Sequence, residues 1–385
     1  MKTFKTFLLF LLLFLFIGGV YMFFRYPYLL KGIKNTYLQG HKTSYISDFN
    51  NYPKRLIANG IHQPWPLHSA YNEPQTSARL EKWNKKYGTV AFLVIKNDSI
   101  LLEKYYQNYT PDSLSNSFSM AKSIVMSLLF KAIQDGYIQS LDQKVIDFFP
   151  EIKGKYASSL TLRHLAAMGS GSNWDENYYS PFSITAESYF TGDLTKLILE
   201  KVRFDNPPGK RWYYSSGDTQ LLGMVIAKAT GKTLSEYLSE SFWKPLGMRK
   251  YAWWNLDRED GMEKAFCCIN ANARDFARFG KLYLHKGNWN GRQIIDSSFI
   301  EQALTPYFKD MPRYGLQWWL FEHNGTKGFM MRGHLGQYVM VIPDENTIIV
   351  RLGQRKPPAP MGTFSKDIWV YLEEGLRISR QAEKF

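Results

Sequence analysis

Apolar positions follow two different periods along the chain, and these periods predict where strands and helices lie. Apolar runs at residues 90–95 and 100–105 flank a polar turn cluster, so they predict a β-hairpin. Residues 338–342 and 347–351 flank a turn that begins with Pro343, and they predict a second hairpin. Strands are therefore expected near residue 90 and again near residue 350.

Between the two hairpins the apolar period becomes helical. Apolar residues recur on one face over residues 124–133 before Gly136, and again over residues 221–229 before Gly231. Residues 233–236 have the pattern of a capping box, which opens a further helix. Strands at both ends with helices between them imply a sheet that pairs segments distant in the sequence.

Residues 1–25 are predicted to be a transmembrane anchor or a signal segment. Residues 6–24 carry no charge and are mostly Phe and Leu, and a helix of this length comes close to spanning a hydrocarbon core of ~30 Å. The lack of an A-x-A-like cleavage site favours an uncleaved anchor over a cleaved signal. Lys2 and Lys5 precede the segment and Arg25 follows it, so positive charge does not fix its orientation.

Residues 26–75 contain several prolines and show no clear apolar period. This pattern predicts a stalk, or a lead-in that wraps the following domain, without an independent fold. Residues 76–385 are then expected to form the main domain, because all the periodic segments lie there.

The composition is that of a folded protein. Of 385 residues, 45% are apolar, and the aromatic residues number 26 Phe, 25 Tyr and 11 Trp. The 48 Lys and Arg exceed the 34 Asp and Glu, which gives a net charge of +14. No basic and aromatic motif accompanies this charge, so no nucleic-acid partner is expected. The sequence leaves the oligomeric state unknown.

The cysteines and histidines predict no metal site and no cofactor. Cys267 and Cys268 are adjacent, so they are poorly placed to join distant segments, and both are interpreted as core residues. The seven histidines are dispersed and form no H-E-x-x-H pattern. The G-K-T triplet at residues 231–233 lacks the first glycine of a phosphate-binding loop, and no G-x-S-x-G motif is present.

Ser119 and Lys122 are the strongest candidates for nucleophilic chemistry. They lie three residues apart at the start of the first predicted helix, where their polar ends would share one face. A serine hydroxyl needs a neighbour to take its proton, and burial can lower the pKa of a lysine enough for that role. The alternative interpretation is a helix-capping serine followed by an exposed lysine.

Two further segments could complete a site. Tyr214 and Ser216 lie in a loop before a predicted helix, where a buried tyrosine beside a cation can shuttle a proton; packing of that tyrosine in the core is the alternative. Residues 332–337 include His334 and Gly336 and lead into the second hairpin. A glycine beside a strand lets a substrate approach closely, and the amide that follows could donate to an oxyanion.

In this order and spacing, the three segments resemble the serine β-lactamase and penicillin-binding-protein family, in its class C and esterase-like branch. The resemblance covers about residues 75–375. It implies an α+β, β-lactamase/transpeptidase-like fold, in which an antiparallel sheet is flanked by helices and carries an inserted, mostly helical subdomain. The α/β part would comprise about residues 76–122 and 270–385, and the helical part about residues 123–269.

The resemblance also assigns roles. It implies that Ser119 is the nucleophile, that Lys122 is its base, and that Tyr214 relays a proton to the leaving group and later from the deacylating water. The backbone N–H groups of Ser119 and Gln337 would form the oxyanion hole, with Gly336 beside them.

Some positions depart from the family pattern. Ser216 stands where the family usually has Asn, and His334 stands where β-lactamases and transpeptidases have a Lys that recognises a substrate carboxylate. A neutral His makes a carboxylate-bearing substrate less expected. Tyr178 and Tyr179 lie where related amide hydrolases have a tyrosine that closes over the substrate; packing among aromatic residues is the alternative.

The sequence therefore predicts a membrane-anchored serine hydrolase that cleaves an ester or amide through a Ser119 acyl-enzyme. One alternative is a D,D-peptidase or β-lactamase that acts on cell-wall peptides or β-lactams. The other is a catalytically silent binding protein of the cell envelope. The resemblance implies an extracytoplasmic, periplasmic catalytic domain, while the substrate itself is not predicted.

Overall fold

A six-stranded antiparallel sheet organises the protein in the computed structural model, which describes residues 2–382. Both predicted hairpins are present, and strands from the two ends of the domain pair at its centre. The strands, in their order across the sheet, are β3 (Ser99–Tyr105), β2 (Thr89–Lys96), β12 (Thr347–Gly353), β11 (Gln337–Ile342), β10 (Thr326–Gly333) and β9 (Trp319–His323).

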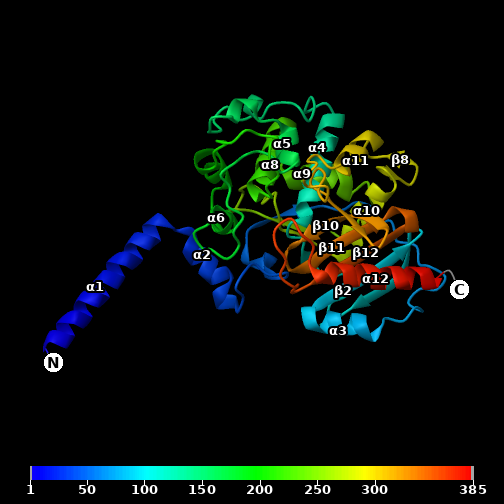
Figure 1. Cartoon of the computed structure of the whole chain (residues 1–385), viewed down its shortest axis with the longest axis horizontal. Coiled ribbons are helices and arrows are strands. Elements are labelled where there is room, and N and C mark those ends of the chain that lie inside the picture. Colours follow the sequence, from blue (N-terminus) through cyan, green and yellow to red (C-terminus); the bar gives the residue numbers. More distant parts are fainter. Residues whose placement is uncertain (1, 383–385) are drawn as a thin grey trace.

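Helices cover both faces of this sheet (Figure 1). A Cβ at Gly280 of α10 (Ala273–Leu284) would meet Val339 and Val341, whereas a Cβ at Gly375 of α12 (Lys366–Gln381) would meet Ile349. Ile349 pairs with Met340, whose side chain points away from Val339 and Val341, so α10 and α12 lie on opposite faces. Helix α3 (Ala78–Tyr87) packs beside α12.

The inserted part of the chain is mostly helical. Helix α4 (Met120–Gln134) packs against α8 (Ser216–Thr230), and α8 ends at Gly231, whose φ of 68° is left-handed and suits glycine. The predicted capping box opens α9, with the Thr233 side chain bonded to the Glu236 N–H. The inserted part also contains α5 (Leu162–Ala166), α6 (Ile184–Phe190), α7 (Leu194–Lys196) and α9 (Leu234–Leu238), whereas α11 (Ser297–Ala303) follows it. Together these elements confirm the expected α+β class.

A second sheet joins the lead-in to the domain. Its four strands run in the order β1 (Lys54–Ile57), β5 (Ala252–Asn255), β6 (Ile269–Ala271) and β4 (Ser115–Asn116). A separate two-stranded ribbon pairs β7 (Asn288–Trp289) with β8 (Arg292–Gln293). Because β1 pairs with β5, residues 26–75 pack on the domain instead of standing apart from it.

The chain before β1 forms two helices of different character. Helix α1 (Lys2–Arg25) projects away from the domain (Figure 1), and its segment Thr3–Arg25 is long and apolar enough to cross a membrane. Helix α2 (Tyr28–Asn35) instead packs against α6, and the Tyr28 hydroxyl donates to the Pro181 carbonyl at 3.0 Å. The two helices therefore place the end of α1 close to α6.

Candidate active site

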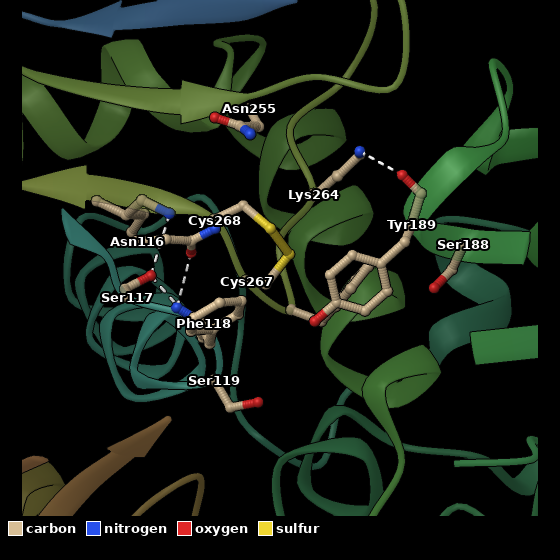
Figure 2. The surroundings of a disulfide bond; sticks show 12 residues. Asn116, Ser117, Phe118, Ser119, Ser188, Tyr189, Asn255, Lys264, Cys267 and Cys268 are labelled. Carbon is tan, nitrogen blue, oxygen red and sulfur yellow. Dashed lines mark hydrogen bonds between the residues drawn. A yellow bond between two sulfur atoms is a disulfide. The ribbon is translucent and has the colours of Figure 1, made fainter. Parts of the chain in front are cut away.

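Ser119 lies at the N-cap position of α4, in a turn that several hydrogen bonds hold. The Asn116 side chain accepts from the Phe118 N–H at 2.8 Å, and the Ser117 N–H donates to the Ile269 carbonyl at 2.7 Å. Phe118 has a φ of 44°, which is unusual for a residue with a side chain. Figure 2 shows that this turn presents the Ser119 hydroxyl away from the strands.

Lys122 is buried one turn into α4 and reaches back to Ser119. Its Nζ lies 3.4 Å from the Ser119 Oγ and donates to the Ser216 Oγ at 3.0 Å and to the Phe266 carbonyl at 2.9 Å. Burial lowers the pKa of Lys122 to about 8, although the charges of Glu176 and Asp218 oppose this shift. A substantial fraction of Lys122 is therefore neutral just above physiological pH.

Tyr214 completes the group that the sequence predicted. Its ring centroid lies 5.3 Å from the Lys122 Nζ, and the side chain is buried. Burial raises the pKa of Tyr214, and the negative charge of Glu176 raises it further, while interactions with Ser119 and Arg332 lower it. The tyrosine therefore stays protonated at neutral pH and can give its proton to a leaving group.

A buried carboxylate that the sequence analysis missed lies behind Lys122. Glu176 accepts from the Ser216 backbone N–H at 2.7 Å, from the Ser216 hydroxyl at 2.6 Å and from the Trp174 indole at 2.7 Å. Because the Ser216 hydroxyl also accepts from Lys122, it links the cation to the carboxylate. Only the aromatic-rich stretch around Glu176 marked this region, and nothing in that pattern singles out the acid.

Tyr178 and His334 stack on one another at one side of the site. Their ring centroids lie 5.6 Å apart with nearly parallel planes, and the Tyr178 hydroxyl donates to Glu176. Burial lowers the pKa of His334 to about 4, so its ring is neutral at physiological pH. Tyr179, by contrast, has 85% of its surface exposed and stands at the rim.

A cavity of about 850 Å³, open solvent at its mouth included, contains Ser119. Its wall includes Tyr178, Tyr179, Tyr214 and His334. Four candidate residues of the described chain are absent from the wall. Lys122 and Ser216 are buried behind it and bonded to each other, whereas Gly336 and Gln337 lie elsewhere.

Gln337 instead begins β11, directly after the turn of residues 334–336 that joins β10 to β11. Its side chain donates to the Gly353 and His334 carbonyls, at 2.6 Å and 3.2 Å. The Gly336 carbonyl accepts from Arg351 at 2.8 Å. The two residues thus hold the turn that carries His334.

Two backbone N–H groups at the cavity have no internal hydrogen-bond acceptor. Within residues 2–382, neither the N–H of Ser119 nor that of His334 donates a hydrogen bond. Both residues line the cavity, which leaves these donors for a substrate oxygen.

Two cations that the sequence analysis did not select also line the cavity. Arg332 stacks over Trp319 at 4.8 Å and donates to the Thr363 carbonyl at 2.8 Å. Lys356 lies in the same wall, and burial together with the charge of Arg332 lowers its pKa. The positive charge that a neutral His334 does not supply is therefore present from other elements.

The segment that contacts Lys122 also carries a disulfide. Cys267 and Cys268 are bonded to one another and buried, directly after Phe266 (Figure 2). Their burial agrees with their interpretation as core residues, but the sequence analysis did not predict the bond between them. Among the described residues, no group of three or more His, Cys, Asp or Glu side chains could hold a metal ion.

Comparison with known families identifies the family of the chain. Residues 75–368 match the family model described as Beta-lactamase. The chain belongs to the β-lactamase family. Membership in this family, together with a curated relative named as a hydrolase, supports a serine hydrolase.

Individual relatives are distant in sequence but similar in fold. The 6-aminohexanoate-dimer hydrolase of Paenarthrobacter ureafaciens is 25% identical over 303 residues, which cover 72% of this β-lactamase-family chain and 76% of the relative. A Bacillus anthracis protein provisionally described as a 6-aminohexanoate-dimer hydrolase superposes with a TM-score of 0.70 at 23% identity, covering 92% and 95% of the two chains.

A third comparison extends the fold to an amidase. The D-amino acid amidase of Ochrobactrum anthropi superposes with a TM-score of 0.59 at 16% identity, covering 78% of this chain and 96% of that one. At such identities the similarity establishes the β-lactamase/transpeptidase-like fold and leaves the substrate open.

Proposed function

We propose that this protein hydrolyses an ester or amide through an acyl-enzyme on Ser119. The Ser119 Oγ attacks the substrate carbonyl carbon while Lys122 takes the hydroxyl proton. The tetrahedral intermediate then collapses, the bond to the leaving group breaks, and Tyr214 protonates that group. The Tyr214 oxygen regains its proton from the Lys122 ammonium, which restores both groups. A water then attacks the acyl-enzyme carbonyl and gives a proton through Tyr214 to Lys122. The bond to the Ser119 Oγ breaks, the Oγ takes up that proton, and the acid leaves.

The observation that supports this proposal most strongly is the setting of Lys122. The lysine is buried, its pKa is lowered to about 8, and its Nζ lies 3.4 Å from the Ser119 Oγ. A lysine in this state can accept the serine proton near neutral pH. Glu176 and Ser216 hold its ammonium in place between turnovers.

For the oxyanion hole we propose the backbone N–H groups of Ser119 and His334. Both residues line the cavity and neither N–H has an acceptor within the described chain. Gln337, which the family resemblance implied, lies outside the cavity wall. The substrate oxygen would thus lie between the start of α4 and the end of β10 (Thr326–Gly333).

A second candidate function is a D,D-peptidase or β-lactamase, and one observation favours it. Arg332 and Lys356 line the Ser119 cavity, and two cations suit a substrate that carries a carboxylate or another anion. These two cations could bind a substrate carboxylate in place of the charge that the neutral His334 lacks. A binding protein without catalysis is less consistent with Ser119, Lys122 and Tyr214 all lying together.

We also propose that α1 anchors the enzyme in a membrane, with the catalytic domain on the extracytoplasmic, periplasmic side. The support is the apolar segment Thr3–Arg25, which is long enough to cross a membrane. The most apolar stretch of this segment is not buried against the rest of the described chain. The extracytoplasmic side is what the resemblance to the penicillin-binding-protein family implies.

The test is intact-mass analysis of the full chain after exposure to a fluorophosphonate and, separately, to a penicillin. We expect one fluorophosphonate adduct on the wild type and none on Ser119→Ala, with equal melting temperatures for the two proteins. A stable penicillin adduct would favour the second candidate. The absence of any adduct on folded wild-type protein would contradict both and favour a binding protein.

A further inference from the structure

A second cavity, more apolar than the first, lies beside the active site. It encloses about 730 Å³, open solvent at its mouth included. Aliphatic and aromatic side chains form most of its wall, among them Leu29, Ile33, Phe118, Tyr189 and Phe190. A mostly apolar, partly open surface of this kind favours an apolar ligand, because filling it removes apolar area from water.

The two cavities share part of their walls. Tyr178, Tyr179 and His334 line both, while the adjacent residues Phe118 and Ser119 line the apolar cavity and the catalytic cavity respectively. A substrate whose carbonyl lies at Ser119 could therefore extend past the stacked Tyr178 and His334 rings into the apolar cavity.

The arrangement of the catalytic groups indicates which part of the substrate would enter. Tyr214, the proposed proton donor to the leaving group, lines the catalytic cavity together with Arg332 and Lys356. The leaving group therefore belongs on that side. The apolar cavity lies on the side of His334 and Phe118, where the acyl part of the substrate would extend.

The amino-terminal helices add a reason for an apolar occupant. Helix α2 (Tyr28–Asn35) supplies one wall of the cavity, and it follows the apolar α1 after a short turn. Ile33 lines the cavity while 45% of its surface is exposed, and Leu30 on the same helix is 55% exposed. The apolar wall is thus continuous with the apolar surface beside the proposed anchor.

We propose that the apolar cavity binds the acyl chain of the substrate, so that the enzyme acts on esters or amides of medium-chain and long-chain acids. This inference rests on the proposed function, because it places the carbonyl at Ser119. It adds the substrate class, which neither the catalytic residues nor the fold specifies.

The experiment measures kcat/KM of the full chain in phosphatidylcholine nanodiscs for p-nitrophenyl acetate, butyrate, hexanoate and octanoate. We expect kcat/KM to rise about fourfold for each methylene that enters the cavity. The rise should be lost in Ala186→Phe, which fills the cavity, and in Ile33→Asp, which charges its wall. In both variants the octanoate-to-acetate ratio should fall at least about tenfold.

Leu30→Asp is the matched control, since it places the same charge on the same exposed helix outside the cavity wall. It should keep the wild-type ratio. Partitioning of the esters into the bilayer is the same for every variant. A difference in the octanoate-to-acetate ratio between Ile33→Asp and Leu30→Asp therefore measures binding in the cavity. Labelling rates of Ser119 with ethyl and octyl fluorophosphonates give the same comparison without turnover.

The outcomes separate the two proposals. Hydrolysis with equal kcat/KM for all four esters, or an unchanged ratio in Ile33→Asp, would overturn the acyl-chain site and leave the serine hydrolase intact. Failure of every ester together with failure of fluorophosphonate labelling would overturn the proposed function and this inference with it. If Ala186→Phe does not fold, the Ile33→Asp and Leu30→Asp pair still decides.

Discussion

Two buried lysines contact the segment around the disulfide, and their surroundings differ in an instructive way. Burial lowers the pKa of both, of Lys122 to about 8 and of Lys264 to about 7. The Lys122 Nζ reaches the hydroxyls of two serines. The Lys264 Nζ instead donates to the Tyr189 carbonyl (Figure 2), and it lies 4.1 Å from the centroid of the Tyr52 ring. A lowered pKa is therefore common to both, and only the neighbouring nucleophile makes one a candidate base.

The largest expected effect comes from removing each lysine in turn. Lys122→Met should lower kcat/KM about 10³-fold, because the Ser119 hydroxyl loses its base. Lys264→Met should leave kcat/KM within about tenfold of the wild type, because no reacting atom lies near it. Steady-state hydrolysis of one ester by the three proteins measures this difference. Similar losses in both variants would show that the comparison between the lysines is wrong.

The burial of Lys264 should instead make the stability of the protein depend on pH. The pKa of Lys264 is lowered from 10.5 to about 7, so the unfolded chain binds more protons than the folded one between these values. The wild type should therefore gain stability relative to Lys264→Met as pH rises from about 7 to 10.5. Thermal denaturation of both proteins across this range measures the gain, and parallel curves would contradict it.

A smaller effect is expected from the cations in the catalytic cavity. Arg332→Gln and Lys356→Gln should each raise KM about tenfold for an ester whose leaving group is anionic, because each removes a charge-assisted contact. A neutral ester of the same length is the control and should change less. Equal effects on both esters would show that the two side chains act by packing alone.

Glu176 offers a way to move the pKa of Lys122 without removing the lysine. Its charge raises that pKa, so Glu176→Gln should lower it. In the wild type kcat/KM should climb as pH rises through about 8, when Lys122 loses its proton. In Glu176→Gln this climb should begin at lower pH. A pH profile that keeps its position would indicate that another group controls the rate.

The smallest effect is expected at His334. Because its pKa is lowered to about 4, the ring carries no charge in the assay range and the proposed oxyanion donor is its backbone N–H. His334→Ala should therefore change kcat/KM by about threefold or less for a short ester, since a backbone N–H survives the substitution. The position of the pH profile should also stay the same. A large loss would mean that the imidazole itself takes part.

The sequence could single out a serine, a lysine and a tyrosine as candidates because their signals are local. Ser119 and Lys122 are one helical turn apart, and Tyr214 lies in a loop next to a recognisable helix. The signals that end two helices, at Gly136 and Gly231, were equally local, and so were those of the two hairpin turns. Turn and cap chemistry depends on a few neighbouring residues.

The partners of these residues could not be predicted in the same way. Glu176 and Ser216 are 40 positions apart, and the Lys122 Nζ and Phe266 carbonyl are 144 apart. Such contacts depend on how the helices pack, and no short pattern encodes them. The disulfide was missed for a different reason, because adjacent cysteines were considered only for links between distant segments.

The sequence alone determined the period of the strands and helices, their caps and the candidates for the reacting side chains, because those properties depend on near neighbours. The tertiary structure decided which charges surround Ser119, since Arg332 and Lys356 reach the cavity only when the sheet and its following loop are in place. It also decided that α2 closes an apolar cavity against α6. Long-range packing sets burial, and burial sets both the pKa of Lys122 and the shape available to a substrate.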